Sequence, residues 1–315
     1  MITKSMNKPT IYAISGPTAS GKTALGVALA KRIGGEVVNF DSVQIYKEIE
    51  IATAKPSAEE MQGIPHLLIN YVDPRVNYTA ADWARDAVVA IQEIEARGNV
   101  PVLVGGTGFY LRTLMKPLFE SPATDADLRR RFQQIGEKKG PEYLHRILSR
   151  VDPDISRNLH PRDHVRVIRA LEVYFQTGER LSIRQQDRGA APEFVSRIAT
   201  FVIEPPRGEL YALIDRRTEA HFGNGLLEEV RGLRQAGIAD STNALGSHGY
   251  RRVCEYFRGE RSLASAVDRT KQDVRNYAKR QLTWFRGDAE VRRLSGFGSD
   301  HRFVDQILSL GAEKA

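Results

Sequence analysis

The chain has 315 residues, 41% hydrophobic and 27% charged, which is the balance of an ordinary globular protein with a full core and a smaller second unit. It has no run of eighteen apolar residues and no apolar stretch before residue 11, so it predicts neither a membrane span nor a signal peptide, and a cytoplasmic location is expected. The single cysteine, Cys254, excludes an internal disulfide and a multi-cysteine metal site. The net charge of +7 favours an anionic partner, either a phosphate compound or a nucleic acid.

A complete phosphate-binding loop of the form G-x-x-x-x-G-K-T follows the first apolar run, at residues 11–15. Its members are Gly16, Pro17, Thr18, Ala19, Ser20, Gly21, Lys22 and Thr23. The run before the loop predicts a buried strand, and residues 24–32 predict a helix. In that context the backbone N–H groups and the helix N-terminus face a polyphosphate, Lys22 neutralises its charge, and the Thr23 hydroxyl can hold Mg²⁺. The motif therefore predicts a di- or triphosphate site.

The remaining elements predict an α/β protein with an interruption. Strand signals at 36–40 and 100–104 alternate with a helix at 80–97, which favours a parallel sheet flanked by helices. Residues 124–188 are helical and heavily charged, with prolines 122, 141, 153 and 161 near helix starts. Strand character returns at 200–203, and long helices are expected from there to the end. We expect a P-loop NTPase-like core of residues 1–121 and 200–315, and an all-helical insertion of residues 122–199.

Two strand ends carry residues suited to chemistry. Asp41 follows the second strand, at the edge where open α/β sheets bind ligands, so it can coordinate a metal through water or accept a proton. With Ser42, it can equally be an ordinary turn cap. The third strand runs into glycines 105, 106 and 108, which either let the backbone approach a phosphate or a large flat group, or make a tight connection. Nearby, His66 is expected to be a solvated or core histidine.

Residues 269–286 form the most basic segment, with six Lys or Arg and one acid. At helical spacing, one stripe contains Lys271, Arg275, Lys279 and Arg286, and the neighbouring stripe is apolar. One stripe is expected to pack while the other faces a polyanion. This spacing fits a nucleic-acid backbone, and the aromatic residues 277, 284 and 285 offer stacking surfaces, although a solvated basic face would look the same. Residues 162–169 repeat the basic pattern.

These segments together resemble the tRNA dimethylallyltransferases, also called isopentenyl-diphosphate:tRNA transferases. The matching segments are residues 16–23, 41–46, 51–56, 104–107, 166–172 with 177–178, and 278–286. The Lys-Arg-Gln-Leu-Thr-Trp block at 279–284 is specific to the family, whereas the phosphate loop alone is not. The resemblance implies transfer of a dimethylallyl group from dimethylallyl diphosphate to N6 of the adenosine at tRNA position 37, just 3′ of the anticodon. The substrates would be tRNAs that read codons beginning with U, and the product N6-(dimethylallyl)adenosine.

The resemblance also implies roles for individual residues. Asp41 matches the general base, and Lys22, the loop amides, Thr23 with Mg²⁺, and Arg217 would stabilise the departing diphosphate. The loop would then hold a leaving group instead of ATP. The insertion would grip the anticodon stem, and a monomer is expected. Residues matching the family's tRNA contacts are Asp41, Ser42, Val43, Gln44, Thr107, Arg129, Val165, Arg166, Val167, Ile168, Arg169, Gly246, Ser247, His248, Gly249, Tyr250, Arg251, Lys279, Arg280, Gln281, Leu282, Thr283, Trp284, Phe285 and Arg286.

Two other functions fit part of the sequence. A P-loop small-molecule kinase would use Asp41 to activate a hydroxyl and ATP as donor, which explains the first third of the chain but not the basic helix or the insertion. A nucleotide-switched RNA-binding protein would not require Asp41. The sequence departs from the family pattern at Ala52, at Leu68 and in residues 247–252. None of these positions belongs to the phosphate loop or is Asp41.

Overall fold

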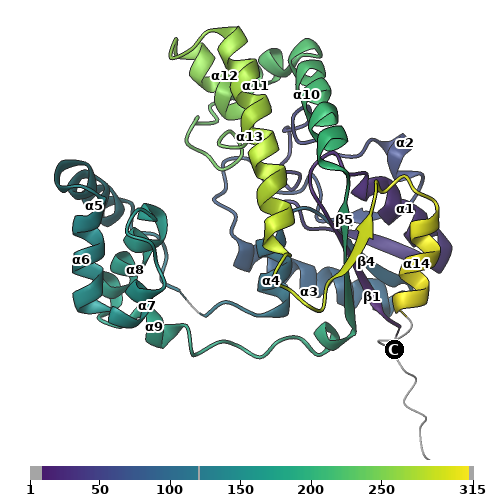
Figure 1. Cartoon of the computed structure of the whole chain (residues 1–315), viewed down its shortest axis with the longest axis horizontal. Helices are drawn as coiled ribbons and strands as arrows, with labels where there is room; N and C mark the ends of the chain where they lie inside the picture. The colour runs from purple at the N-terminus through teal and green to yellow at the C-terminus, as the bar shows by residue number, and fades with distance from the viewer. Residues whose placement is uncertain (1–8, 120, 312–315) are drawn as a thin grey trace, which may run out of the picture. The chain divides into compact units, whose positions relative to one another are not determined.

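The computed structural model of the chain describes residues 9–119 and 121–311 (Figure 1). The chain divides into two compact units, one made of residues 1–115 and 192–315 and the other of residues 116–191. We call the first the α/β unit and the second the helical unit. The ends of the predicted core, residues 1–8 and 312–315, lie outside the described residues.

The α/β unit is built on a parallel sheet. Its strands are β1 (Ile11–Ser15), β2 (Gly35–Asn39), β3 (His66–Leu67), β4 (Val100–Val104), β5 (Ile198–Glu204) and β6 (Arg292–Ser295). Their order across the sheet is β3-β2-β4-β1-β5-β6, and every recorded pairing between neighbours is parallel. In register, Tyr12 of β1 lies beside Val102 of β4 on one side and Ala199 of β5 on the other. The phosphate-binding loop therefore leaves the sheet from a central strand.

The helices of this unit cover both faces of the sheet. They are α1 (Lys22–Ile33), α2 (Ala58–Met61), α3 (Ala80–Ala96), α4 (Gly108–Met115), α10 (Arg207–Gly223), α11 (Leu226–Gln235), α12 (Tyr250–Phe257), α13 (Leu263–Trp284) and α14 (Arg302–Gly311), with a 3₁₀ turn at Glu193–Arg197. Leu25 of α1 and Phe303 of α14 pack with Phe201 on one face. Trp83 of α3 and Leu111 of α4 pack with the other face.

The residues around the first strand show why the chain turns where it does. All five residues of β1 are buried, as their apolar and β-branched side chains predict. Gly21 precedes α1 with a φ of 85°, and Gly34 ends the helix with a φ of 66°, both in the left-handed region that favours glycine. The loop and α1 are thus fixed by backbone conformation as well as by packing.

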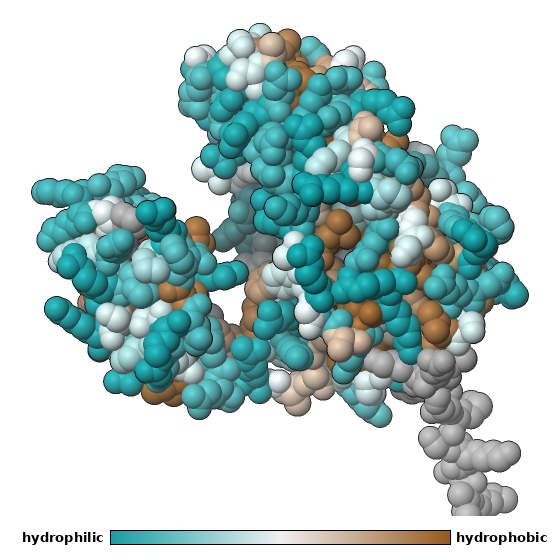
Figure 2. All heavy atoms as spheres, in the orientation of Figure 1, coloured by the Kyte–Doolittle hydropathy of each residue, from teal (hydrophilic) through white to brown (hydrophobic). Residues whose placement is uncertain are grey.

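The helical unit contains α5 (Ala126–Lys139), α6 (Pro141–Val151), α7 (Pro153–Arg157), α8 (His164–Thr177) and α9 (Leu181–Arg184). Aspartates cap three of these helices: Asp125 before α5, Asp152 before α7 and Asp163 before α8. Their apolar faces form a separate core around Leu148 and Leu171. Figure 2 shows a largely hydrophilic surface over this unit.

Three details differ from the sequence-based expectations. The chain was expected to be helical after 203, but residues 292–295 form the edge strand β6, in which only Leu294 is buried. The two-residue strand β3 was also not expected. The expected insertion began at 122 and ended at 199, whereas the contacts place its limits at 116 and 191. Phe194 explains the second limit, because it is buried in the core of the α/β unit.

Candidate active site

A cavity of about 540 Å³ lies at the carboxyl ends of β1, β2 and β4. The phosphate-binding loop forms one wall, with Ala19 held at a φ of 61°, an unusual conformation for a residue other than glycine. Lys22 and Thr23 open α1, and the first N–H groups of a helix have no intrahelical acceptor. The loop therefore presents N–H donors and a helix N-terminus to this cavity.

Lys22, Asp41 and Arg217 line this cavity together. The Lys22 ammonium donates to the Pro17 carbonyl at 2.7 Å. Burial lowers the pKa of Lys22 to about 8, with the negative charge of Asp41 opposing and the positive charge of Arg217 assisting this shift. Burial also lowers the pKa of the Arg217 guanidinium. Two cations and one carboxylate, partly removed from water, thus converge beside the loop.

Asp41 is both a turn cap and a cavity residue. Its Oδ1 accepts from the N–H groups of Val43, at 2.9 Å, and Gln44, at 3.3 Å. The Thr107 hydroxyl fixes the same turn, since it accepts from the Ser42 N–H at 3.0 Å. The two alternatives left open for Asp41 are therefore compatible, because the turn orients a carboxylate that still borders the cavity.

Residues 50–55 form a second wall whose backbone is held by several side chains. The Glu229 carboxylate accepts from the N–H groups of residues 50 and 51, at 3.1 and 3.0 Å, and from the Tyr250 hydroxyl at 2.5 Å. The Tyr250 oxygen in turn accepts from the Ala52 N–H at 3.2 Å. Lys55, only 6% exposed, donates to the Tyr46 carbonyl at 2.6 Å. These hydrogen bonds hold the backbone of this wall in place.

Gln44 completes that wall from inside the cavity. Its amide nitrogen donates to the carbonyls of Thr53, at 3.1 Å, and Ala54, at 3.0 Å. Ala54 has a φ of 53°, so the two hydrogen bonds hold a conformation that alanine rarely adopts. His66 of β3 also lines the cavity, with Nδ1 2.8 Å from the Ile64 carbonyl oxygen and a pKa that burial lowers. Burial therefore favours the neutral form of the His66 imidazole.

A narrow side extension of the cavity lies between the loop and α10. Arg217, His221 and Phe222 of α10 line it together with Ala19. Burial, with help from the Arg217 charge, lowers the pKa of His221 to about 4, so this imidazole is neutral near pH 7. The extension therefore combines one guanidinium with mostly uncharged groups.

The glycines after β4 are approached by groups of the protein itself. A Cβ on Gly105 would lie 2.5 Å from the Phe40 backbone, and one on Gly108 would lie 2.3 Å from the Trp284 ring. A Cβ on Gly106 would lie 2.1 Å from the Gln281 amide nitrogen. The close approaches at these glycines are thus made by the chain itself, and the approach of a ligand at this strand end stays a prediction.

The basic stripe of α13 is divided in two, which corrects the expectation that its four cations all face a polyanion. Lys271 pairs with Glu219 at 2.6 Å, and Arg275 pairs with Asp215 at 2.7 Å. Both acids lie on α10, so these two cations join the helices. Lys279, Arg280 and Arg286 are exposed. The basic surface offered by this segment therefore lies at its carboxyl end.

Several residues matched to tRNA contacts have buried side chains. Val167 and Ile168 pack in the helical unit, while Tyr250 and Phe285 pack in the α/β unit. Gln281 is also buried, and Leu282 is half-buried. Their exposed neighbours are Arg166, Arg251, Lys279, Arg280, Thr283, Trp284 and Arg286. The side chains of the buried members pack within the protein, and contact of these segments with RNA stays a prediction.

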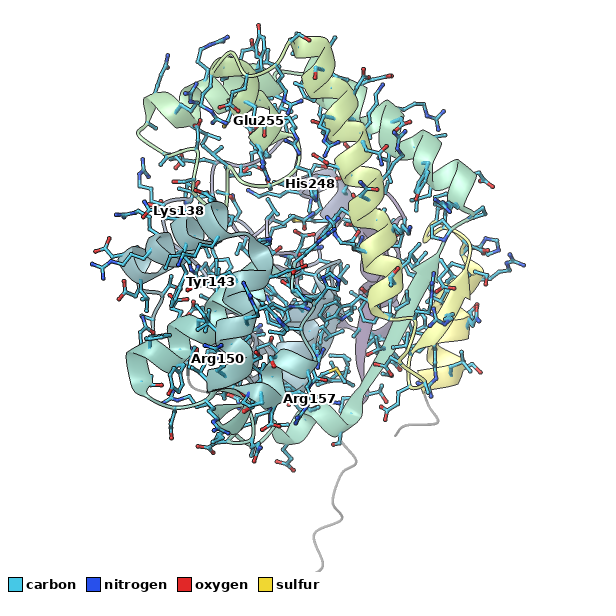
Figure 3. All side chains as sticks on the ribbon, turned by 60° about the vertical axis from the view of Figure 1, so that its left-hand side comes forward. Lys138, Tyr143, Arg150, Arg157, His248 and Glu255 are labelled. Atoms are coloured by element: carbon cyan, nitrogen blue, oxygen red, sulfur yellow. The ribbon has the colours of Figure 1, made fainter. Side chains whose placement is uncertain are left out.

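His248 lies beside α13, with its ring centroid 4.9 Å from that of Tyr277 (Figure 3). Burial and the Arg280 charge lower the pKa of His248. The following residues enter α12, where Arg252 pairs with Glu255 and with Asp273 of α13, both at 2.6 Å. This paired cluster fixes the end of the 246–251 loop, which lies at the cavity through Gly246 and His248.

The helical unit contains its own buried charge cluster. Glu172 is fully buried and accepts from the Asp125 N–H at 2.8 Å and from Arg129 at 2.7 Å, while Arg169 lies 3.1 Å away. On the surface, Lys139 and Arg146 flank the Tyr143 ring, which Figure 3 shows on the same unit as Lys138, Arg150 and Arg157. Val165, 79% exposed, stands at the start of α8. The surface of this unit thus carries several cations, some of which pair with neighbouring acids, as Arg157 does with Asp154.

Two features are absent from the described residues. No group of three or more His, Cys, Asp or Glu side chains in residues 9–119 and 121–311 is arranged to hold a metal ion. Within the same residues, no helix is long and apolar enough to cross a membrane.

Comparison with known proteins decides the family. The family model described as IPP transferase matches residues 44–288. The chain belongs to the IPP transferase family. It is 47% identical to a tRNA dimethylallyltransferase of Geobacter metallireducens, over 91% of this chain and 93% of the relative. It is 42% identical to a tRNA dimethylallyltransferase of Koribacter versatilis, over 97% and 99% of the two chains.

Solved structures of IPP transferase relatives have the same fold. A tRNA isopentenylpyrophosphate transferase from Bacillus halodurans matches with a TM-score of 0.71 and 36% identity, over 98% of this chain and 97% of the other. A eukaryotic dimethylallyltransferase acting on tRNA matches with a TM-score of 0.75 and 28% identity, over 97% and 78%. The α/β core with a P-loop NTPase-like arrangement is thereby confirmed.

Sequence reasoning missed several residues that shape the site of this IPP transferase family member. Lys55 lies in the segment 51–56, which resembles the family, but residue spacing does not predict its three hydrogen bonds. Glu229 lies on the amphipathic helix α11 and His221 on α10, and neither residue carries a motif. Their roles arise because α10 and α11 pack against loops more than 150 residues earlier, and periodicity alone does not report such contacts.

Proposed function

We propose that the chain transfers a dimethylallyl group from dimethylallyl diphosphate to N6 of the adenosine at tRNA position 37. The acceptors are tRNAs that read codons beginning with U, and diphosphate is released. The observation that carries this proposal is the convergence of Asp41, Lys22 and Arg217 on one cavity beside a phosphate-binding loop. Relatives named as tRNA dimethylallyltransferases, aligned over nearly the whole chain, support it over a kinase or an RNA switch.

The chemistry requires help at both reacting atoms. The lone pair of the adenine N6 is delocalised into the ring, so N6 needs a base that takes its proton as it attacks. Asp41, oriented by its turn, supplies that carboxylate. The bond from the allylic carbon to oxygen breaks as the carbon–nitrogen bond forms, and the electron pair leaves with the diphosphate. Lys22 and Arg217 stabilise the charge that grows on the departing oxygens.

The donor set also fits a magnesium ion. Mg²⁺ keeps several waters and binds through one or two protein groups plus phosphate oxygens. The Thr23 hydroxyl at the start of α1 is such a group, and the described residues hold no cluster of carboxylates or imidazoles that would suit a dedicated metal cage. When bound, the ion would neutralise charge on the diphosphate.

The tRNA partner fits the charge distribution of each unit. Because N6 is paired or stacked in ordinary RNA, the adenine must be flipped out of its stack to reach the cavity. Lys279, Arg280 and Arg286 are exposed at the end of α13 and suit an RNA backbone. In the helical unit, the basic helices suit the anticodon stem. The proposal keeps the monomeric state and the cytoplasmic location expected from the sequence.

A single labelling experiment tests the function. The protein is incubated with Mg²⁺, labelled dimethylallyl diphosphate and an unmodified tRNA that reads U-initial codons. Label should enter the RNA, and digestion should place it on the nucleoside at position 37. The matched control is the same tRNA with guanosine at position 37, which lacks the exocyclic N6 amine and should stay unlabelled.

A parallel reaction with ATP separates the alternatives. ATP should not be consumed, because no phosphoryl acceptor takes part in the proposed reaction. Turnover of ATP with no label in the RNA would overturn the proposal in favour of a kinase. RNA binding that responds to ATP, with neither labelling nor turnover, would point instead to a nucleotide-switched RNA-binding protein.

A further inference from the structure

Gln281 of α13 connects the phosphate-binding loop to the end of β4. Its side-chain oxygen accepts from the Thr18 N–H at 2.8 Å, and its side-chain nitrogen donates to the Gly106 carbonyl at 2.9 Å. The residue is only 5% exposed, and both ends of its amide are engaged. Gln281 and Thr18 also line the cavity. This side chain is therefore a part of the anion site, although it lies 263 residues from its partner.

The two hydrogen bonds change what the loop can offer to a ligand. A phosphate-binding loop holds its anion through backbone N–H groups, and here the Thr18 N–H is already taken by an oxygen of the protein. The donors that begin α1, at Lys22 and Thr23, remain at the helix N-terminus. The loop thus keeps a smaller set of donors than its eight-residue motif suggests.

The same contact places a hydrogen-bond acceptor beside Thr18, where the loop would otherwise present a backbone N–H donor. The Gln281 carbonyl oxygen carries partial negative charge and repels phosphoryl oxygens that approach Thr18. Glycine at 106 leaves the space that the Gln281 amide occupies. A Cβ at that position would lie 2.1 Å from its nitrogen. A preorganised group of this kind costs no rearrangement when the ligand binds.

We propose that Gln281 is a positioning residue that sets the loop for a diphosphate and against a nucleoside triphosphate. This inference rests on the proposed function, in which the loop holds the diphosphate of the donor. Gln281 acts through the loop backbone: it holds the Thr18 peptide in one orientation and withholds its N–H from a third phosphoryl group. The preference belongs to the contact, so any change that displaces the Gln281 amide should weaken it.

Calorimetric titration of the full chain with Mg²⁺ and either inorganic diphosphate or ATP tests the inference. The wild-type chain should bind diphosphate at least tenfold more tightly than ATP. Gln281→Ala should reduce that ratio by about tenfold, the order expected for one lost hydrogen bond together with the freed amide. Gln272→Ala is the matched control, since Gln272 is exposed on the same helix, and its ratio should equal that of the wild type.

Gly106→Ala provides a second, independent variant. It leaves Gln281 in the chain but fills its space, so it should lower the same ratio. Because both changes act on one contact, the double variant should lose no more than either single one. Thermal melting of each variant verifies that it is folded, and Gln281→Glu replaces any variant that is not. The glutamate can still accept from Thr18, but it adds a negative charge and should weaken binding of both anions.

The outcomes distinguish failure of the role proposed for Gln281 from failure of the proposed function. If a folded Gln281→Ala chain and a folded Gly106→Ala chain keep the wild-type ratio, Gln281 does not set the preference, whatever the enzyme transfers. If the wild-type chain itself binds ATP more tightly than diphosphate, the proposed function fails and this inference fails with it. The inference is supported if the affinity for diphosphate relative to ATP falls in both variants and is unchanged in Gln272→Ala.

Discussion

At the scale of single residues, the site depends on charges that are partly removed from water. Lys22 keeps its charge at neutral pH because Asp41 offsets part of the cost of burial. One carboxylate oxygen of Asp41 accepts hydrogen bonds from the N–H groups of its own turn. A local cap therefore fixes the direction of the group proposed as the base.

The proposed role of Asp41 predicts a defect in turnover rather than in binding. Asp41→Ala should lower kcat by about 10²-fold or more, because the proton on N6 loses its acceptor. Affinity for tRNA should be largely retained. Single-turnover kinetics and a tRNA binding isotherm measure the two effects. If tRNA affinity collapsed while kcat changed little, Asp41 would be a binding residue only.

Lys22 predicts a dependence of diphosphate binding on pH. Its pKa of about 8 lies below the ordinary value, so the ligand-free chain loses this positive charge as the pH rises through about 8. Affinity for diphosphate should fall over that interval. Titrations between pH 7 and pH 9 measure the change. Lys22→Arg is the control for ionisation of the ligand itself: its guanidinium stays charged, and any decline that persists in it does not come from Lys22.

At the scale of elements, α13 has two functions along its length. Its middle is tied to α10 by two ion pairs, while its carboxyl end is exposed and basic. At the same carboxyl end, Gln281 and Trp284 pack on the glycine run after β4. The middle of the helix is therefore anchored to α10, and its carboxyl end is open to a partner.

The division of α13 predicts two different outcomes for charge removal. Replacing Lys279 and Arg286 with alanine should weaken tRNA binding and reduce its salt dependence by about one phosphate contact each, with diphosphate affinity unchanged. Replacing Lys271 and Arg275 in the same way should affect thermal stability more than the salt slope, since both are paired with α10. Binding measured from 50 to 200 mM salt distinguishes them. Equal slopes for the two double variants would contradict this division.

The sequence predicted elements well where their signals were local. Residues 11–15 and 100–104 form β1 and β4 as expected, and Pro141 and Pro153 open α6 and α7. It failed at β6, because only Leu294 of that edge strand is buried and four residues give no periodic pattern. The ion pairs of Lys271 and Arg275 also could not be foreseen. Helical spacing reports which residues share a face, but not which helix covers that face.

At the scale of the whole molecule, the chain builds two units with separate cores. The helical unit is inserted between α4 and β5, and its stability depends on contacts within residues 116–191. Glu172 of α8 is central to it, because this fully buried carboxylate joins α8 to α5 through Arg129 and also pairs with Arg169 on its own helix. Changes there should leave the other unit intact.

Glu172→Gln tests this independence. Loss of the carboxylate removes the negative charge that pairs with Arg129 and Arg169. The free energy of unfolding of the helical unit should fall by about 2 kcal/mol. This loss is smaller than that for a fully buried ion pair, because both arginines are partly exposed. Denaturation followed by circular dichroism measures the loss. Binding of diphosphate to the α/β unit should not change. A parallel loss of diphosphate affinity would show that the two units are energetically coupled.

The phosphate-binding loop is completed by residues far along the chain. Residues 16–23 leave the ribosome early, yet their supports are Gln281 and Gly298, whose N–H donates to the Ser20 carbonyl at 2.8 Å. During synthesis, the loop therefore cannot form these contacts until almost all of the chain has been translated. A fragment that ends before residue 281 contains the whole motif but not the finished site. The protein therefore first has its complete donor site only after its last helices have been translated.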